Sequence, residues 1–236
     1  MKLADFDALT FDCYGTLIDW ESGMVRGLAP LVDAVGGLTR DEVLNAHAEE
    51  ESGQQARTPH MRYSDLLAIV YKRLAERWGR PASREDCVAY GQSVKDWPAF
   101  PDSAEALRSL KERYKLVILS NVDNDSFTGS NARLGVEFDA IITAEDVGSY
   151  KPADANFETM VSALGRMGIG KSRILHVAES LFHDHVPAKR HGLSNVWIHR
   201  RHAVGGFGAT MPVADQPEVD WRFASMAEFA SAAAAA

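Results

Sequence analysis

The chain has 236 residues, of which 46% are hydrophobic and 25% charged, and its formal net charge is −8. This length and composition are typical of a soluble globular protein with one large domain, or with a smaller domain inserted into a larger one. The net negative charge disfavours partners that bind basic surfaces, so we expect neither nucleic acid nor a membrane to be bound.

The two cysteines, Cys13 and Cys87, lack the spacing of a disulfide framework or a zinc site. No apolar run reaches the length of a membrane span and the first residues do not resemble a secretion signal, so we expect a cytoplasmic location.

Short apolar runs recur along the chain, with helix-like segments between them. The runs are rich in Val, Ile, Leu and Phe, which is typical of strands buried on both faces of a parallel sheet. Helical spacing at 104–114 and at 155–165 predicts two helices, capped by Asp102-Ser103 and by Asp154, and a last helix is expected to start at Ser225. The alternation predicts a doubly wound, parallel, Rossmann-like α/β sheet. The expected strands are residues 8–11, 116–119, 140–143, 174–177 and 195–198, and the closing alanine run 232–236 is left out of the expected fold.

The segment 18–98 breaks this alternation. Its apolar residues follow helical periodicity, and the turn signals at 36–37, 58–59 and 79–81 divide it into four helices. We therefore expect an all-helical cap domain, inserted after the first strand, over an α/β core made of residues 1–17 and 99–236. The acidic run 49–51 is expected to form a solvated face of a cap helix.

Polar residues follow four of the expected strands. The carboxyl ends of parallel strands meet at one edge of the sheet, and open α/β sheets bind their ligands at this edge. A buried charge is costly unless it is used or paired, and Asp12 is not needed to form the first strand. Asp12 is therefore a candidate nucleophile. The full set is Asp12 and Thr16 after the first strand, Ser120 and Asn121 after the second, Lys151 after the third, and Glu179 and Asp184 after the fourth.

Through these residues the chain resembles the haloacid dehalogenase superfamily of hydrolases, and the resemblance extends over nearly the whole chain. Within this superfamily the chain is most similar to the L-2-haloacid dehalogenase branch. The run 11–17, Phe-Asp-Cys-Tyr-Gly-Thr-Leu, matches the first family motif, and Ser120-Asn121 matches the second. Tyr150-Lys151-Pro152 matches the third motif, and 177–184 stands where the acidic fourth motif lies. The helical insert matches the family's cap.

The residue at position 14 distinguishes two kinds of family member. Family phosphatases carry a second Asp two positions after the nucleophile, where it protonates the leaving alcohol, whereas this chain has Tyr14. A phenol with a pKa near ~10 is a poor general acid at neutral pH. A halide leaves without a proton, so Tyr14 favours dehalogenation.

The resemblance implies a covalent mechanism. Asp12 attacks the carbon that bears the halogen, and water then hydrolyses the resulting ester. Lys151 orients Asp12 and favours its ionised form where the pocket is dry. The resemblance implies that Thr16 and Ser120 donate to Asp12, that Asn121 donates toward the halide and that Phe182 lines the halide pocket. Tyr14 and His183 are further substrate-pocket residues, and the water activator is predicted to be Asp184, with His183 as the ungapped alternative.

The chain also departs from the dehalogenase pattern. The branch holds the substrate carboxylate with an Arg on the second cap helix, expected near 43–44, where this chain has none; Arg40 is the nearest substitute. Phe157 replaces a family Tyr. Glu179 stands where phosphatases keep a magnesium ligand, so Asp12, Glu179 and Asp184 form an alternative oxygen site for Mg²⁺. By contrast, the adjacent residues 183–185, His-Asp-His, are not expected to converge on one metal ion.

Three functions follow from this sequence. The favoured one is a hydrolytic dehalogenase that acts on a small 2-halo carboxylic acid and needs no cofactor. The others are a Mg²⁺-dependent phosphatase and a catalytically altered binding protein. The oligomeric state stays open, a homodimer included.

Overall fold

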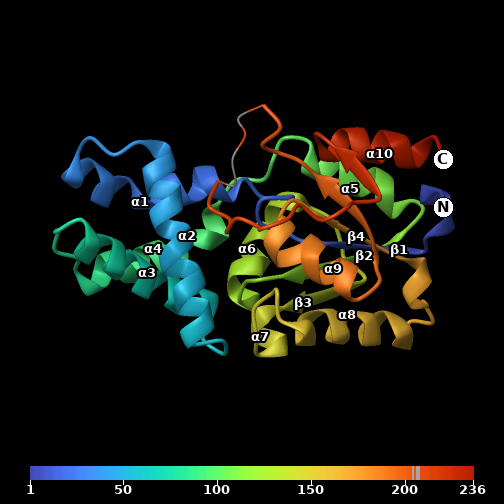
Figure 1. Cartoon of the computed structure of the whole chain (residues 1–236), viewed down its shortest axis with the longest axis horizontal. Coiled ribbons are helices and arrows are strands. Elements are labelled where there is room, and N and C mark those ends of the chain that lie inside the picture. The colour runs from blue at the N-terminus through green and yellow to red at the C-terminus, as the bar shows by residue number, and fades with distance from the viewer. Residues whose placement is uncertain (204, 206–207) are drawn as a thin grey trace.

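The computed structural model describes residues 1–203, 205 and 208–236. Its centre is a parallel sheet of six strands in the order β3-β2-β1-β4-β5-β6 (Figure 1). The five expected strands and the doubly wound α/β class are confirmed. Trp221–Phe223 was not predicted, because a half-exposed edge strand of three residues lacks a buried apolar run. The strands are β1 (Ala8–Phe11), β2 (Lys115–Ser120), β3 (Ala140–Thr143), β4 (Ile174–Ala178), β5 (Ser194–Ile198) and β6 (Trp221–Phe223).

Helices cover both faces of this sheet. Alternate residues of β2 point to opposite faces, so Leu116 and Ile118 join one apolar cluster while Val117 and Leu119 join another. The first cluster contains side chains of α5, α6 and α10, and the second contains those of α8 and α9. These helices are α5 (Ser103–Lys111), α6 (Asn124–Leu134), α7 (Ala144–Val147), α8 (Asp154–Arg166), α9 (Val186–Arg190) and α10 (Met226–Ala234).

Three local expectations for these helices were wrong. Asp102 lies at the N-cap of α5, but its carboxylate pairs with Arg200 at 2.9 Å instead of capping the helix. Asp154 is the first residue of α8, and its side chain binds Arg190. The helix that follows Ser225 runs to Ala234 and buries Ala233, so leaving out the alanine run was also wrong.

Four α-helices lie within residues 18–98, as the periodicity predicted. Three of them begin with side-chain caps, from Asp19, Thr39 and Ser83. The third and fourth of these helices approach each other closely at Gly91. A Cβ atom added there would lie 2.0 Å from the carbonyl oxygen of Ser64, so the contact requires glycine. They are α1 (Trp20–Val35), α2 (Arg40–Arg57), α3 (Tyr63–Arg77) and α4 (Arg84–Gln92). Short 3₁₀ turns at Leu3–Asp5, Ser93–Asp96 and Lys171–Arg173 and a π-helical turn at Leu181–His185 complete the elements.

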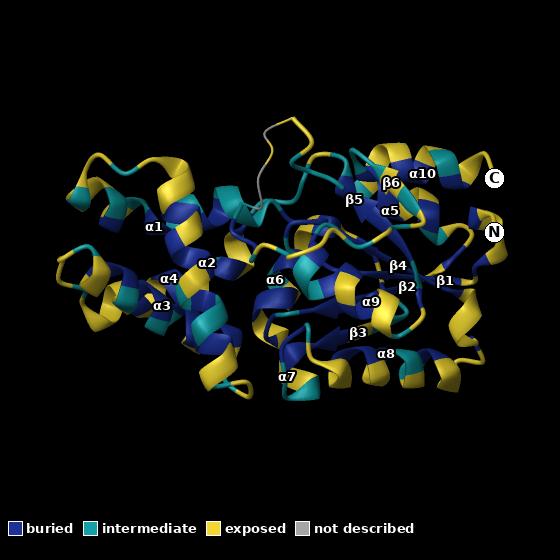
Figure 2. Cartoon of the chain, in the orientation of Figure 1, coloured by how far each residue is buried: buried dark blue, intermediate teal, exposed yellow. Residues whose placement is uncertain are grey.

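The four helices form a separate layer beyond the carboxyl ends of β1, β2 and β4 (Figure 1). They contact the sheet's loops through buried polar bonds: Asp123 accepts from the Ser64 N–H at 2.7 Å, and the Tyr150 hydroxyl donates to the Met61 carbonyl at 2.6 Å. Buried residues continue through both parts of the chain in one apolar cluster (Figure 2). The division into a core and a cap at 18–98 therefore stays a prediction. Within the described residues, no helix is long and apolar enough to cross a membrane.

Candidate active site

Asp12 lies in the turn directly after β1 and is 5% exposed. Its Oδ2 accepts a hydrogen bond of 2.8 Å from the Thr16 hydroxyl, which in turn accepts one of 2.8 Å from the Glu179 N–H. Gly15, with φ +94°, makes the turn that brings Thr16 back to Asp12. The expected contact between Thr16 and Asp12 is thus present.

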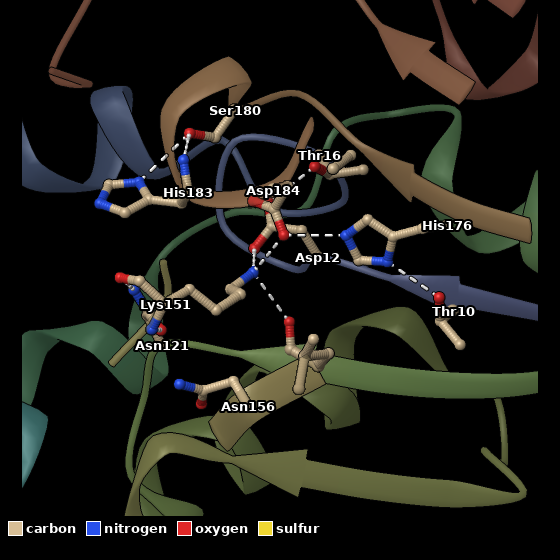
Figure 3. A network of polar contacts seen from close by, with 12 residues as sticks. Thr10, Asp12, Thr16, Asn121, Lys151, Asn156, His176, Ser180, His183 and Asp184 are labelled. Atoms are coloured by element: carbon tan, nitrogen blue, oxygen red, sulfur yellow. Dashed lines mark hydrogen bonds and ion pairs between the residues drawn. The ribbon is translucent and has the colours of Figure 1, made fainter. Parts of the chain in front are cut away.

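Lys151 joins two carboxylates at the centre of the site (Figure 3). Its Nζ donates to Asp12 Oδ1 at 2.9 Å, to Asp184 Oδ1 at 2.7 Å and to the Leu119 carbonyl at 2.9 Å. These three bonds use all the donors of an ammonium group, and the side chain is 1% exposed. Burial opposes the charge, but the two carboxylates outweigh burial and raise the pKa of Lys151, so the lysine stays protonated.

The pKa values of the two carboxyl groups shift in opposite directions. Burial raises the pKa of Asp12, although Lys151 lowers it in part. Burial acts on Asp184 too, but Lys151 and His176 outweigh it and hold the pKa of Asp184 below its usual value. Asp184 Oδ1 is occupied by these two donors, whereas its buried Oδ2 has no partner among the described residues. That oxygen is free to accept from a water or a substrate.

His176, which lies inside β4, was not predicted as a site residue. Its Nε2 is 2.9 Å from Asp184 Oδ1, and its Nδ1 is 2.8 Å from the Thr10 hydroxyl (Figure 3). Bonds on both ring nitrogens fix the orientation of the imidazole, and therefore that of Asp184. The available signal was a histidine in an otherwise apolar buried run.

Two residues at the carboxyl end of β2 differ from expectation. Ser120 is buried, but its hydroxyl has no hydrogen-bond partner in the part of the chain that the structure describes, so the expected bond to Asp12 was wrong. Asn121 lines the pocket, yet its amide binds the backbone of Lys151: the Lys151 N–H donates to Oδ1 at 2.6 Å and Nδ2 donates to the Lys151 carbonyl at 3.0 Å. Asn121 thus holds Lys151 in place.

A pocket opens above Asp12 between the sheet edge and the helical layer. Tyr14 lies in its wall, and its hydroxyl is 2.8 Å from Ser130 Oγ. Burial raises the pKa of Tyr14 well above its ordinary value, which leaves the phenol neutral. The other lining residues are Trp20, Glu51, Gln55, Tyr63, Asn121, Lys151, Ser180, His183, Asp184 and Thr210.

His183 faces this pocket as expected, whereas Phe182 and Arg40 are not among its lining residues. His183 Nδ1 lies 3.2 Å from the Ser180 hydroxyl, and burial lowers the pKa of this imidazole, which favours its neutral form. Phe182 packs edge-on against the ring of His183. Arg40 is half-exposed and lies 3.6 Å from Glu21, so the structure does not bring it to the site. Phe157 is buried under the sheet, against His176.

The acidic run 49–51 is not uniformly solvated. Glu49 is exposed and binds Arg77, but Glu51 is 7% exposed and lines the pocket. The expectation of a solvated face was therefore wrong for Glu51. A run of three acids spans most of a helical turn, so at least one of them points away from the solvent side.

The alternative magnesium site does not fit this arrangement. Asp12 and Asp184 already share the positive charge of Lys151, and Glu179 lines a neighbouring pocket with Gly15 and Arg200. Across residues 1–203, 205 and 208–236, no group of three or more His, Cys, Asp or Glu is placed to hold a metal ion.

Removal of metal is expected to leave activity unchanged, because Lys151 supplies the positive charge beside Asp12. Halide release from 2-chloropropionate is measured before and after dialysis against EDTA, with Mg²⁺ added back as the control. Loss of activity on chelation that Mg²⁺ restores would contradict this expectation.

Glu179 should make stability depend on pH. Burial, and then the charge of Asp12, raise the pKa of Glu179 from 4.5 to about 8. The folded protein therefore holds this proton more tightly than the unfolded chain, and the stability it contributes is lost as the pH rises from 4.5 toward 8. Glu179→Gln is expected to raise the free energy of unfolding at pH 8 by about 1–2 kcal/mol and to change it little at pH 4.5.

Urea denaturation at both pH values measures this difference. Glu158→Gln, which changes an exposed acid on α8, is the matched control. An identical pH dependence in wild type and Glu179→Gln would show that Glu179 does not hold the proton.

The sheet is parallel, a lysine holds an aspartate at its carboxyl edge, and helices that follow the first strand cover this edge. This combination is typical of the class of hydrolases that use an aspartate as nucleophile. A profile of the haloacid dehalogenase-like hydrolases matches residues 6–192. The chain belongs to this family.

Curated relatives and solved structures agree with the family. An (S)-2-haloacid dehalogenase from Pseudomonas sp. (strain YL) is 35% identical over 202 residues, 81% of this chain and 82% of the relative. (S)-2-haloacid dehalogenase 4A from Burkholderia cepacia is 26% identical, over 82% of this chain and 83% of the relative. The structure of the L-2-haloacid dehalogenase from Xanthobacter autotrophicus with chloropropionic acid covalently bound superposes with a TM-score of 0.77 at 20% identity, covering 96% of this chain and 97% of that chain. The last comparison shows a shared fold.

Proposed function

We propose that this chain is a hydrolytic dehalogenase that converts a small 2-halo carboxylic acid to a 2-hydroxy acid through an ester of Asp12. The observation that carries the proposal is a buried aspartate in the pocket wall, oriented by Thr16 and Lys151, with a neutral tyrosine in place of a leaving-group acid. The curated relatives named above are 2-haloacid dehalogenases, which supports the same activity. In this proposal the helices within 18–98 act as the cap.

In the first step, one carboxylate oxygen of Asp12 attacks C2 of the substrate. The new C–O bond forms as the carbon–halogen bond breaks, and the halide leaves with the bonding electrons. Thr16 and Lys151 hold the carboxylate in one orientation, so little reorganisation is needed for attack.

The leaving group needs no proton, which agrees with the position of Tyr14. Its hydroxyl bonds to Ser130 and its pKa is raised by burial, so it cannot supply a proton as the acid of a phosphatase does.

In the second step, water attacks the carbonyl carbon of the Asp12 ester. The water gives one proton to a base as its oxygen adds to the carbonyl carbon. The bond between that carbon and the substrate oxygen then breaks, and the substrate oxygen takes the proton back from the base and leaves as the 2-hydroxy acid. The remaining carboxyl group of Asp12 loses its proton to solvent, which restores the carboxylate. Asp184 Oδ2 has no hydrogen-bond partner among the residues that the structure describes, which supports Asp184 as the base beside Lys151. His183 is the alternative base, with a neutral imidazole in the same pocket.

Trapping of the ester tests this proposal. Asp184→Asn is expected to permit the first step and to stall the second, so that a covalent adduct on Asp12 accumulates after addition of 2-chloropropionate. Intact-protein mass spectrometry and peptide mapping measure the adduct, with wild type and His183→Ala treated in parallel. An adduct in His183→Ala and none in Asp184→Asn would reverse the assignment, and halide release without an adduct on Asp12 in any of these proteins would count against the ester.

A further inference from the structure

One face of α2 carries three polar side chains where a buried helix face usually carries apolar ones. His47, Glu51 and Gln55 lie four residues apart, so they line up along the helix, and all three are buried. Burial of polar groups is costly unless the groups are paired or used. We call these three residues the α2 polar row.

The α2 polar row is held in place by its own contacts. Gln55 Nε2 donates to Glu51 Oε1 at 3.1 Å, and His47 Nδ1 lies 3.3 Å from Glu51 Oε2. The Tyr90 hydroxyl lies 2.8 Å from His47 Nε2 on the far side of the imidazole. These neighbours fix the position of the Glu51 carboxylate before any ligand enters.

Glu51 and Gln55 face the same pocket as Asp12. The positive charge in that pocket comes from Lys151, whose three donors are already used by Asp12, Asp184 and a backbone carbonyl. None of the described lining residues is an arginine. A second negative charge on a ligand would therefore meet the carboxylate of Glu51 without a compensating cation, whereas an N–H group would find an acceptor.

We propose that Glu51, supported by Gln55 and His47, is a specificity residue that accepts a hydrogen bond from an N–H group on the substrate. The inference rests on the proposed dehalogenase function. The preferred substrate is then a 2-halo carboxylic acid whose other end carries an amide or an ammonium group. Glu51 selects this end of the substrate, and Asp12 reacts at C2.

An isosteric pair of substrates tests this inference. 2-Chlorosuccinamate carries an amide where 2-chlorosuccinate carries a second carboxylate, and the two are otherwise alike. We expect kcat/KM for halide release from the amide to exceed that from the diacid by about 100-fold in wild type, because the diacid meets Glu51. Glu51→Gln should reduce this ratio at least ~10-fold, mainly through faster turnover of the diacid. Glu50→Gln, which removes a neighbouring carboxylate that faces Arg77 outside the pocket, should leave the ratio unchanged.

Binding of the products gives a readout that needs no turnover. Wild type should bind 2-hydroxysuccinamate more tightly than malate by titration calorimetry, and Glu51→Gln should lose most of this preference. An unchanged preference in Glu51→Gln, or tighter binding of malate by wild type, would overturn the role of Glu51. If neither chlorinated compound nor 2-chloropropionate releases halide with wild type, the proposed function fails instead, and the binding ratio still decides whether Glu51 selects for N–H groups.

Discussion

Asp12→Asn is expected to abolish halide release from 2-haloacids, with kcat lower by at least about 10⁴-fold. An amide is a far weaker nucleophile than a carboxylate, so no ester forms. Thr16 and Lys151 remain in place to bind the new side chain, so the fold should be retained. Halide release and the mass of the intact protein after addition of substrate measure the two expected losses.

A matched substitution separates the loss of the nucleophile from a general effect on β1. Asp7 precedes the same strand at its other end, is exposed and pairs with Arg173. Asp7→Asn should retain the wild-type rate. A correctly folded Asp12→Asn protein that turns over like wild type would refute the assignment of Asp12 as nucleophile.

Lys151→Met is expected to lower both activity and stability. It leaves the buried carboxylates of Asp12 and Asp184 without the ammonium that each contacts. Removal of one partner from a buried ionic group typically costs about 3–5 kcal/mol, because the remaining charge is uncompensated. The free energy of unfolding at pH 8 should therefore fall by about this amount, and halide release should fall with it, since Asp12 loses its orientation.

The pH dependence of this variant has a definite sign. Without Lys151, burial and mutual repulsion raise the pKa values of both carboxylates in the folded state. The folded variant then binds protons more tightly than the unfolded chain, so its stability should fall as the pH rises from 5 to 8. Urea denaturation at these pH values measures the effect.

Lys115→Met is the control, because Lys115 is exposed on β2 and pairs with Asp139 at the surface. It should change the free energy of unfolding by less than about 1 kcal/mol. A Lys151→Met protein as stable as wild type at pH 8 would show that the central lysine does not compensate these charges.

The sequence by itself determined the sheet and the residues at its edge. Residues 8–11 and 116–119 are mainly apolar runs, and a strand that is buried on both faces of a parallel sheet requires such a run. Because parallel strands end at a common edge, the order along the chain was enough to predict that Asp12, Lys151 and Asp184 meet. β6 was not predictable in this way, since Trp221–Phe223 is short and only half-buried.

Only the tertiary structure decided which partner each polar group has. Ser120 and Asn121 are neighbours at the carboxyl end of β2. The Ser120 hydroxyl nevertheless lacks a partner among the described residues, whereas the Asn121 side chain holds Lys151. Arg40 and Glu51 lie on the same helix, and the resemblance to the dehalogenase branch favoured Arg40 as the pocket residue. The packing of α2 over the sheet instead turns Glu51 toward Asp12 and leaves Arg40 half-exposed. The position of a side chain along a helix is set locally by the sequence. Whether that side chain faces the pocket or the solvent depends on how the helix packs against segments far away in the sequence, and this packing involves the whole buried surface.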